Sequence, residues 1–411
     1  MGKQAIIGFE LNENEAQLCR YDFEKEDAVS IMVTVGGSMS AFPAVLSCIT
    51  ETGKWNYGIE AEFMAKHKDA VLIDSILEKC SRKEKIAVGE REYGPAEILS
   101  FFIAGALSAA GIREPKAELG MLVISVPETT KRFAKNAAEA FSILGITGKA
   151  FIQDKDESFF YHTLFQKVEV HSGKVGLFRF RDAQRVDFSS LNINRGTRPI
   201  TVSIDEEKSW LLPEDDSEKD ESFSEFIKEC FRNENFSGAF IVGKAFDKNL
   251  AAESMRLLCR GQRHVFYGDN LFAKGACYAA YVRNGGGRLK DYLFLGKDIV
   301  RKNISIDMVV DGKLMVYPLV IAGRHWYEAD KTIEFISDDT GKVQLNISSM
   351  DTGTRSHISI NTSELPKRPA GTTRLKLDIK FNSPDSCSAK VTDLGFGELF
   401  PASGMAFKEM I

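Results

Sequence analysis

The chain has 411 residues, of which 44% are hydrophobic and 27% are charged, with a formal net charge of −5. This composition is typical of a globular protein long enough for two or three domains with their own cores. The weak negative charge argues against a nucleic-acid groove and against binding to an anionic membrane surface. No apolar run reaches the about 20 residues of a membrane span. We therefore expect neither a nucleic-acid partner nor a membrane partner.

The cysteines, the histidines and the N-terminus indicate the compartment. Seven cysteines are scattered without the close spacing of a zinc or redox motif, and six histidines are equally dispersed, so we expect no metal site. Residues 1–4 do not begin a signal peptide, because the apolar stretch after them is too short. These features favour buried, reduced thiols in a cytoplasmic protein.

The first predicted element is a hairpin with an acidic turn. Two strand-like runs, at 6–11 and 16–21, flank a polar turn that carries Glu10, Glu13 and Glu15. Phosphate-binding loops need glycines, hydroxyls and free backbone N–H groups. Carboxylates at this place would repel a triphosphate. The hairpin therefore raises the question whether a nucleotide site has been lost.

Strands and helices alternate up to about residue 283. An almost continuous apolar run at 119–126 predicts a central strand buried on both faces. Ser125 and Glu128 have the spacing of a capping box, which predicts a helix from about Glu128 to Gly145. Hydrophobic periodicity predicts three further elements, namely a helix at 95–110, a central strand at 239–243 and a helix near 250–258.

The pattern changes after this part of the chain. Within it, an acidic run at 214–221 predicts a solvated loop, and after it the glycines of Asn284–Arg288 predict a hinge. Beyond the hinge, polar and apolar residues alternate in runs separated by turn residues, at 332–336, 343–347, 357–360 and 374–381. We therefore expect an all-β domain from about residue 291 to 400, built as an antiparallel sandwich.

In this order the elements resemble a heat-shock chaperone of the DnaK type, in the actin-like ATPase superfamily. The best match is the strand–Pro–helix element at 123–146, and 239–243 is similar to the family's adenosine strand. Residues 270–276 resemble its closing helix, and Asp291–Leu295 resembles its apolar interdomain linker. The stretch at 365–391 is similar to the end of the peptide-binding β-domain. The resemblance covers most of the chain.

The resemblance implies an α/β fold followed by an all-β fold. The first part would be a two-lobed actin-like ATPase fold with a truncated second lobe, and the second part a β-sandwich that resembles a chaperone peptide-binding domain. The expected boundaries are 1–283 for the ATPase-like domain (lobes at about 1–165 and 166–283), 284–295 for the hinge and linker, 296–400 for the sandwich and 401–411 for a short tail.

The nucleotide motifs of the family do not carry over. Its first hairpin reads D-L-G-T-T, and the matching stretch here runs from Glu10 to Asn14 without a glycine or a threonine. Its second phosphate loop has a glycine triplet, whereas 178–185 has no glycine, and side chains there would block close backbone approach to a phosphate. The degenerate cleft positions are Glu10, Asn12, Glu13, Asn14, Asp154, Arg179, Arg181, Arg185, Gly243 and Lys244.

The three arginines allow two interpretations. They could bind an anion directly through their guanidinium groups. They could instead pair with Glu10, Glu13 or Asp182 and hold the cleft shut without a ligand. We favour internal pairing, and we expect no catalytic residue and no cofactor. On this interpretation Glu13→Lys should destabilise by more than the about 0.5 kcal/mol of an ordinary surface change.

The sequence favours a binding protein over an enzyme. Only 404–411 follow the β-domain, so we expect no helical lid over it. By resemblance, a peptide groove would be lined near Met315, Phe335, Val343 and Leu345, which could equally be core residues. The leading hypothesis is a chaperone-like pseudo-ATPase that binds or scaffolds a protein or extended peptide. The alternatives are a divergent chaperone that hydrolyses ATP with magnesium, and an actin-like scaffold.

Overall fold

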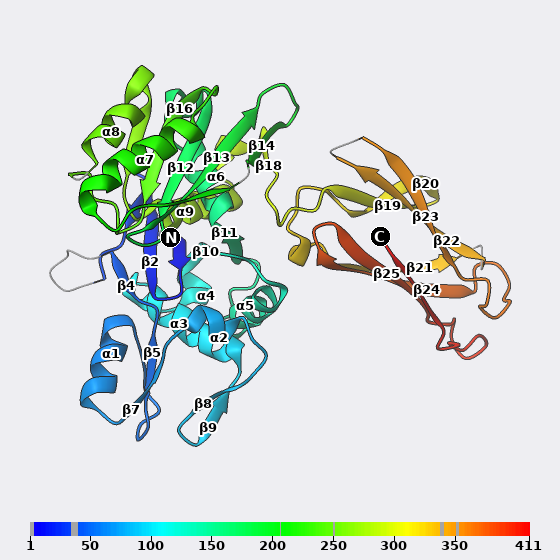
Figure 1. Ribbon diagram of the computed structural model, residues 1–411. Coiled ribbons are helices and arrows are strands. Elements are labelled where there is room, and N and C mark those ends of the chain that lie inside the picture. The colour runs from blue at the N-terminus through cyan, green and yellow to red at the C-terminus, as the bar shows by residue number, and fades with distance from the viewer. Residues whose placement is uncertain (1–3, 34–39, 206, 250, 338–340, 351–352) are drawn as a thin grey trace. The chain divides into compact units, whose positions relative to one another are not determined.

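The chain divides into two compact units, Met1–Phe294 (unit 1) and Leu295–Ile411 (unit 2) (Figure 1). Unit 1 is mixed α/β and unit 2 is nearly all β, so the predicted class of α/β followed by β is confirmed at this level. The computed structural model describes residues 4–33, 40–205, 207–249, 251–337, 341–350 and 353–411.

The first sheet of unit 1 contains β1 (Ala5–Leu11), β2 (Glu15–Asp22), β3 (Asp27–Ser30), β4 (Ala41–Pro43), β10 (Leu119–Val126) and β11 (Ala150–Asp154). Their order is β11-β10-β1-β2-β3, with β4 beside β2. Strands β1, β2 and β3 form an antiparallel meander, whereas β1, β10 and β11 run parallel. The predicted N-terminal hairpin is confirmed, and every residue of β10 is buried as predicted.

The second sheet contains β12 (Lys174–Phe180), β13 (Arg185–Asn194), β14 (Ile200–Ile204), β15 (Lys208–Leu211), β16 (Phe236–Val242), β17 (His264–Tyr267) and β18 (Tyr292–Phe294). Their order is β17-β16-β12-β13-β14-β18, with β15 beside β13. Again three strands form an antiparallel meander and the first of them, β12, pairs in parallel with β16, which pairs in parallel with β17. The two sheets therefore repeat one topology.

Six helices of unit 1 cover the two sheets or surround them: α3 (Pro95–Ala109), α5 (Lys131–Ile143), α6 (Lys155–Leu164), α7 (Asp216–Cys230), α8 (Ala252–Leu258) and α9 (Leu271–Arg283). Helices α7 and α8 pack on one face of the second sheet (Figure 1). Helix α6 packs on its other face, while α9 packs on the first sheet and also contacts α6. Helices α6 and α9 thus connect the two sheets.

Two glycines allow α9 to approach its neighbours closely. A Cβ atom at Gly275 would lie 2.0 Å from the carbonyl oxygen of Ser158 in α6. A Cβ atom at Gly8 in β1 would lie 2.2 Å from the backbone nitrogen of Cys277 in α9. Both neighbours are backbone atoms, which cannot move aside as a side chain can. Only glycine fits at these two positions, so they set the spacing between the sheets and the helices.

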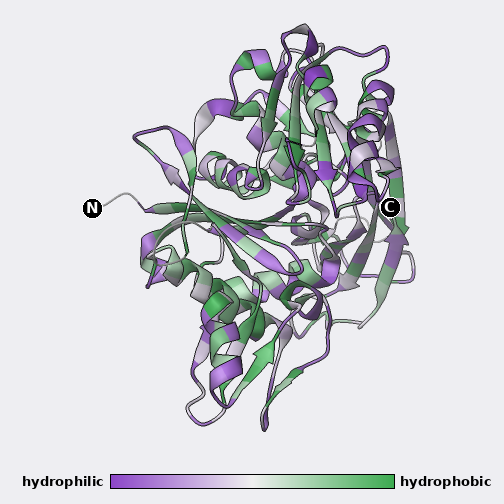
Figure 2. Ribbon diagram, turned by 60° about the vertical axis from the view of Figure 1, so that its left-hand side comes forward, coloured by the Kyte–Doolittle hydropathy of each residue, from purple (hydrophilic) through white to green (hydrophobic). Residues whose placement is uncertain are grey.

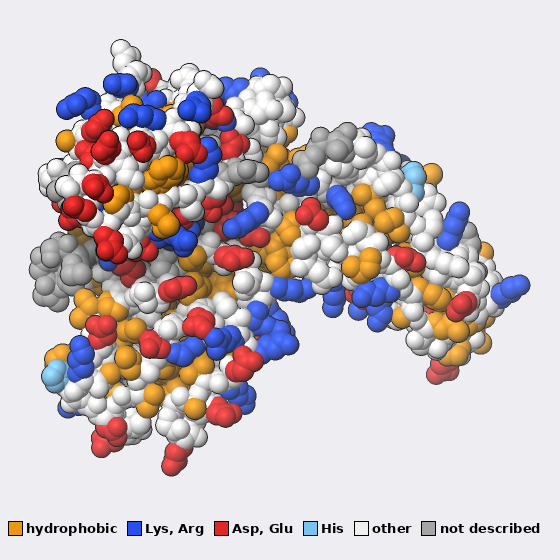
Figure 3. Space-filling view, in the orientation of Figure 1, with side chains coloured by type: hydrophobic (Ala, Val, Ile, Leu, Met, Phe, Trp, Pro, Cys, Tyr) orange, Lys and Arg blue, Asp and Glu red, His pale blue; other side chains and the backbone are white. Residues whose placement is uncertain are grey.

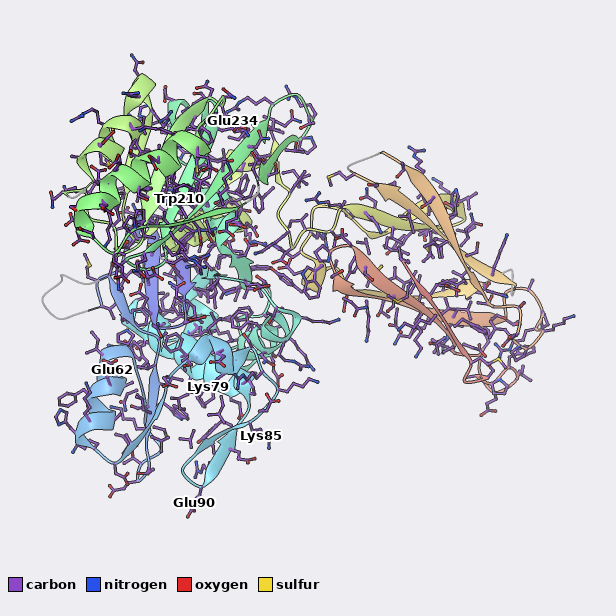
Figure 4. All side chains as sticks on the ribbon, viewed as in Figure 1. Glu62, Lys79, Lys85, Glu90, Trp210 and Glu234 are labelled. Atoms are coloured by element: carbon purple, nitrogen blue, oxygen red, sulfur yellow. The ribbon has the colours of Figure 1, made fainter. Side chains whose placement is uncertain are left out.

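The remaining elements of unit 1 form small peripheral structures: β5 (Leu46–Ile49), β6 (Trp55–Tyr57), α1 (Gly58–His67), β7 (Ala70–Ile73), α2 (Ile76–Cys80), β8 (Ile86–Val88), β9 (Arg91–Tyr93) and α4 (Pro115–Glu118). Figure 4 labels Glu62, Lys79, Lys85 and Glu90 in this region. In the described part of the chain no helix has the length and apolar character needed to cross a membrane.

Two predicted boundaries in unit 1 were wrong for reasons of local hydrogen bonding. Helix α5 begins at Lys131, because the Thr130 hydroxyl accepts a hydrogen bond from the Phe133 N–H and caps the helix there. The acidic run is not a loop but the start of α7. Asp215 caps that helix through the Ser217 N–H, and carboxylates are favourable near a helix N-terminus.

An aromatic contact holds α7 against β15. Trp210 of β15, labelled in Figure 4, stacks on Phe226 with ring centroids 5.3 Å apart, and its indole N–H donates to the Ser222 hydroxyl at 3.0 Å.

Part of the segment predicted to be an interdomain linker is a strand of unit 1. Tyr292–Phe294 forms β18 and pairs in parallel with β14.

Unit 2 is a sandwich of two four-stranded sheets. One contains β19 (Lys302–Val310), β20 (Lys313–Val320), β22 (Lys342–Ser349) and β23 (Arg355–Asn361), and the other contains β21 (Lys331–Ser337), β24 (Thr373–Ser383), β25 (Ser386–Asp393) and β26 (Ala406–Met410). Their orders are β20-β19-β22-β23 and β21-β24-β25-β26. The predicted strands are confirmed, but the expected C-terminal tail instead contains β26, which pairs with β25. Figure 2 shows that hydrophilic and hydrophobic residues both occur along the strands.

A buried ion pair closes one end of the sandwich. Arg368 donates to both carboxylate oxygens of Asp393, at 2.7 and 2.8 Å, and the two side chains are 4% and 0% exposed. Asp393 also accepts hydrogen bonds from the backbone N–H groups of Gly395 and Ser403. The Arg368 guanidinium, with these N–H groups, holds the pKa of Asp393 well below its usual range. The pair anchors the loop after β25 to the sandwich.

The α6–α9 contact predicts a strong effect of one methyl group. We expect Gly275→Ala to lower the free energy of unfolding of unit 1 by about 3 kcal/mol or more, because the added Cβ would overlap the Ser158 carbonyl. Gly287→Ala is the matched control, since its Cβ would meet only Lys290 at an ordinary 3.5 Å. Urea unfolding followed by tryptophan fluorescence measures both, and equal effects would contradict the prediction.

Candidate functional site

A cavity of unit 1 lies where strands of its two sheets end near each other. Its volume is about 640 Å³, within the range of small-molecule sites. It is lined by the β1–β2 turn, the first turn of α6, the ends of β12 and β16 and the start of α9. The structure brings together here eight of the predicted cleft residues: Glu10, Asn12, Glu13, Asn14, Arg179, Arg181, Gly243 and Lys244.

Two predicted cleft residues lie elsewhere. Asp154 is 4% exposed and caps α6 by accepting a hydrogen bond from the Glu157 N–H, so its role is structural. Arg185 is exposed at the start of β13 and is not part of the cavity wall. The acid that faces the cavity most deeply is Glu10, near the end of β1.

Glu10 and Lys155 form a buried ion pair in the cavity wall. Their side chains are 3% and 16% exposed, and the Lys155 Nζ lies 3.5 Å from Glu10 Oε1. Asn12 donates to the same oxygen at 2.9 Å, whereas Oε2 is buried and has no hydrogen-bond partner among the described residues. Burial raises the pKa of Glu10 and lowers that of Lys155, and each charge opposes the effect of burial on the other.

Sequence reasoning missed Lys155, although a signal was present. Lys155 is the first residue of α6, directly after its N-cap. A cation is unfavourable at a helix N-terminus, so a lysine at this position needs a tertiary partner. Glu10 supplies the opposite charge, and the ring of Phe272 lies 4.8 Å from Nζ. This pair, and not a pair of Glu10 with an arginine, neutralises the deepest acid of the cavity.

Arg179 and Arg181 are paired internally, but with other acids than those predicted. Arg179 pairs with Glu207 and with Asp156 at 3.5 Å, and Arg181 pairs with Asp187 at 2.6 Å. Burial raises the pKa of Asp187, but hydrogen bonds from Ser209 and Arg181 outweigh it and lower the pKa overall. Among the described residues neither Arg179 nor Arg181 forms an ion pair with Glu10, Glu13 or Asp182, so those pairings were wrong, and Asp182 accepts only the backbone N–H of Arg185, at 2.7 Å, from the three arginines.

The expectation of a cleft filled by its own salt bridges was also wrong. The acids that bind the arginines come from α6, β13 and the β14–β15 connection, so these pairs run along the wall. One surface pair, Lys244 with Glu15, joins the end of β16 to β2 across the cavity mouth. Figure 3 shows acidic and basic side chains intermixed over unit 1. The cavity thus stays open between paired charges.

The cavity offers little that would hold a phosphate or a metal ion. Gly243 directly follows β16, and its backbone N–H already donates to the Asp269 carboxylate at 3.1 Å. The Arg179 and Arg181 guanidinium groups are engaged by carboxylates, and Glu13 and Asp182 add negative charge to the wall. Within the described ranges, no cluster of three or more His, Cys, Asp and Glu side chains is arranged to hold a metal ion.

The residues proposed for a peptide groove in unit 2 separate into two groups. Val343 and Leu345 are 4% and 0% exposed and belong to the sandwich core, so they do not line a groove. Phe335 is half-buried and packs against the same core. Met315, in contrast, is 44% exposed on β20. Met315 lies in the stretch of β20 from Lys313 to Val316, in which every residue is exposed.

Comparison with known families divides the chain where its two units meet. Residues 27–297 match the model described as "Family of unknown function (DUF5716) C-terminal", so the chain belongs to this family. Residues 299–411 match a "Domain of unknown function (DUF8552)". No curated protein matches the chain. Neither description states an activity, so the function is argued from the geometry.

Because Glu10 and Lys155 form a buried pair, a variant without Lys155 should have a stability that depends on pH. Lys155→Met should lower the free energy of unfolding by about 3 kcal/mol at pH 7, because it leaves the Glu10 carboxylate buried and uncompensated. Glu10 then has a folded pKa above the about 4.3 of an unfolded Glu. The destabilisation is full above the folded pKa and shrinks as pH falls through it, since Glu10 takes up a proton. Chemical unfolding between pH 7 and pH 4 measures this.

Two controls accompany Lys155→Met. Lys244→Met removes an exposed pair and should cost less than about 1 kcal/mol, with little dependence on pH. Glu13 is exposed and forms no ion pair with any described residue, so Glu13→Lys should now cost less than about 0.5 kcal/mol. A loss for Lys155→Met that is equal at pH 4 and pH 7 would contradict the role assigned to Glu10.

Proposed function

We propose that the protein is a non-catalytic, chaperone-like binding protein, in which an actin-like unit without nucleotide hydrolysis carries a sandwich that holds an extended segment of a protein partner. The repeated topology of the two sheets in unit 1 supports the two-lobed fold that the resemblance implies. The placement of α6 and α9 between the sheets agrees with it.

The chemistry of the cavity supports a non-catalytic unit 1. A triphosphate would face Glu10, whose free Oε2 cannot be satisfied by another anion, and it would have to displace acids from both Arg179 and Arg181. The loop after β12 contains no glycine, so its side chains would prevent a phosphate from approaching the backbone closely. Each of these features would weaken the binding of a nucleotide.

The observation that carries the binding function is the edge of β20. Three consecutive apolar residues, Leu314, Met315 and Val316, are 77%, 44% and 61% exposed. Strand β20 is the last of its sheet, so among the described residues no strand pairs with its outer edge. Proteins usually protect such an edge with charges, bulges or a covering segment. Pro318 and a register irregularity protect the far end of β20, whereas the Leu314–Val316 stretch has neither and is suited to pairing with an extended peptide.

A second surface residue extends the apolar edge. Val309 of β19 is 62% exposed and lies directly opposite Leu314 in the β19–β20 hairpin. Directly paired residues share a face of the sheet, and so do residues two apart in one strand, so Val309, Leu314 and Val316 form one apolar face. A peptide with alternating apolar side chains would gain backbone hydrogen bonds from the edge and side-chain contacts from this face.

One observation favours the divergent ATP-dependent chaperone as a second candidate. The cavity is open, its volume of about 640 Å³ suits a nucleotide-sized molecule, and Lys155, Arg179, Arg181 and Lys244 are all in its wall. The two functions predict opposite outcomes in a nucleotide titration.

We expect ATP, ADP and AMP with magnesium to leave the melting temperature of the full chain unchanged at concentrations of about 1 mM. A ligand at 100 times its Kd would add about 2.7 kcal/mol of stability, so a real site would be evident. The measurement is thermal unfolding with and without nucleotide, with calorimetric titration beside it. A rise in melting temperature that Arg179→Met abolishes would favour the second candidate.

Peptide binding is predicted to depend on the β20 edge. The double substitution Leu314→Lys and Val316→Lys should weaken the binding of fluorescently labelled apolar heptapeptides at least tenfold, about 1.4 kcal/mol, as measured by anisotropy on the full chain. Ile336→Lys is the matched control, because Ile336 is 51% exposed on β21 of the other sheet. Equal loss in both variants, or no peptide binding at all, would reject the edge as the binding surface.

A further inference from the structure

A second cavity of about 220 Å³ lies on the α6–α9 side of the second sheet, where β16 and β17 end. Its wall combines residues from α6, α9, β16, β17 and β3. The carboxyl ends of neighbouring parallel strands are a common place for ligands in open α/β sheets. Apart from Val242, its lining residues differ from those of the larger cavity, so it is a separate site.

His162 of α6 faces this cavity without a hydrogen-bond partner. The residue is 9% exposed, its Nδ1 is buried and unpaired, and no described residue forms a hydrogen bond with either ring nitrogen. Burial, followed by the charge of Lys274, lowers the pKa of His162 to about 3. The ring is therefore neutral at pH 7 and presents one donor and one acceptor. Nε2 is not closed off as Nδ1 is, so it is the ring nitrogen that a ligand in the cavity could reach, and it has no partner among the described residues.

Two opposite charges lie in the same wall. Lys274 of α9 is half-buried, and no described carboxylate lies within 4.0 Å of its ammonium group. Asp27 of β3 accepts hydrogen bonds from the Tyr278 hydroxyl and from the Ala28 N–H, both at Oδ1. No described residue donates to its Oδ2. The cavity thus has a free cation, a neutral imidazole and a carboxylate with one free oxygen.

The rest of the wall is apolar and aromatic. Phe240 and Phe266 stack with centroids 5.0 Å apart, and the His162 ring meets Phe240 edge to face at 5.2 Å. Leu271 and the half-exposed Tyr267 complete this side. The volume equals that of about seven water molecules in the liquid. A molecule of similar size is far smaller than a nucleotide and close to a free amino acid with a short apolar side chain.

We infer that this cavity binds a free α-amino acid with an apolar side chain. Its carboxylate would accept from Lys274 and from the His162 N–H, and its ammonium group would donate to Asp27 Oδ2. Its side chain would pack on Phe240 and Phe266. A zwitterion leaves the net charge of the cavity unchanged, whereas a simple anion would face Asp27 and a simple amine would face Lys274.

The unmodified full-length protein provides the first test. Saturation-transfer NMR and calorimetric titration would use L-valine, L-leucine and L-phenylalanine, with 4-methylpentanoic acid and isopentylamine as analogues of leucine that lack one charge. We expect saturable binding of at least one amino acid below about 10 mM, and at least tenfold weaker binding of both analogues. No saturable amino-acid binding, or equal binding of either analogue, would overturn the inference.

Variants place the binding in this cavity. Lys274→Met should weaken amino-acid binding at least tenfold, and Asp27→Asn should remove the preference for leucine over 4-methylpentanoic acid. Lys228→Met, on the exposed face of α7, is the matched control and should bind like the unmodified protein. Circular dichroism melts verify folding. Unchanged binding in folded Lys274→Met would overturn the assignment.

Discussion

The close approach of α9 to α6 and to β1 is the constraint on which the rest of unit 1 depends. Backbone meets backbone at Gly275 against Ser158 and at Gly8 against Cys277, with no room for even one methyl group. Because α9 packs on the first sheet and α6 on the second, this contact sets the distance between the sheets. Both cavities lie beside it, and both include residues of α9 or of the segment just before it.

The charges of unit 1 follow from this arrangement. Strands of the two sheets end near each other, so acids and bases from distant parts of the sequence share one cavity wall. Glu10 is buried there and would destabilise the fold as an isolated anion, which Lys155 prevents. Arg179 and Arg181 are paired within their own part of the unit. The cavity is consequently lined in part by ion pairs and remains open.

Unit 2 has a buried apolar interior and also exposes apolar residues on one hairpin. Its interior follows the period-two pattern, with Leu345, Leu375 and Val391 fully buried between the sheets. The β19–β20 hairpin extends an apolar face to the surface, where Leu314 is 77% exposed. Burial of that residue would require a partner segment. A stable sandwich that leaves one edge apolar is consistent with a surface kept for binding.

The sequence by itself determined the elements that depend on local pattern. The acidic N-terminal hairpin, the buried run of β10, helix α3 and the alternating strands of unit 2 all follow from periodicity and turn residues. It also identified most of the residues that meet in the large cavity, through their positions in the resemblance. Only the tertiary structure decided the partners, because pairing depends on which side chains become neighbours across the fold. The partners Lys155 of Glu10 and Glu207 of Arg179 are distant in the sequence, and the lack of a partner for His162 depends on what surrounds it in the fold, so no local pattern contains these features.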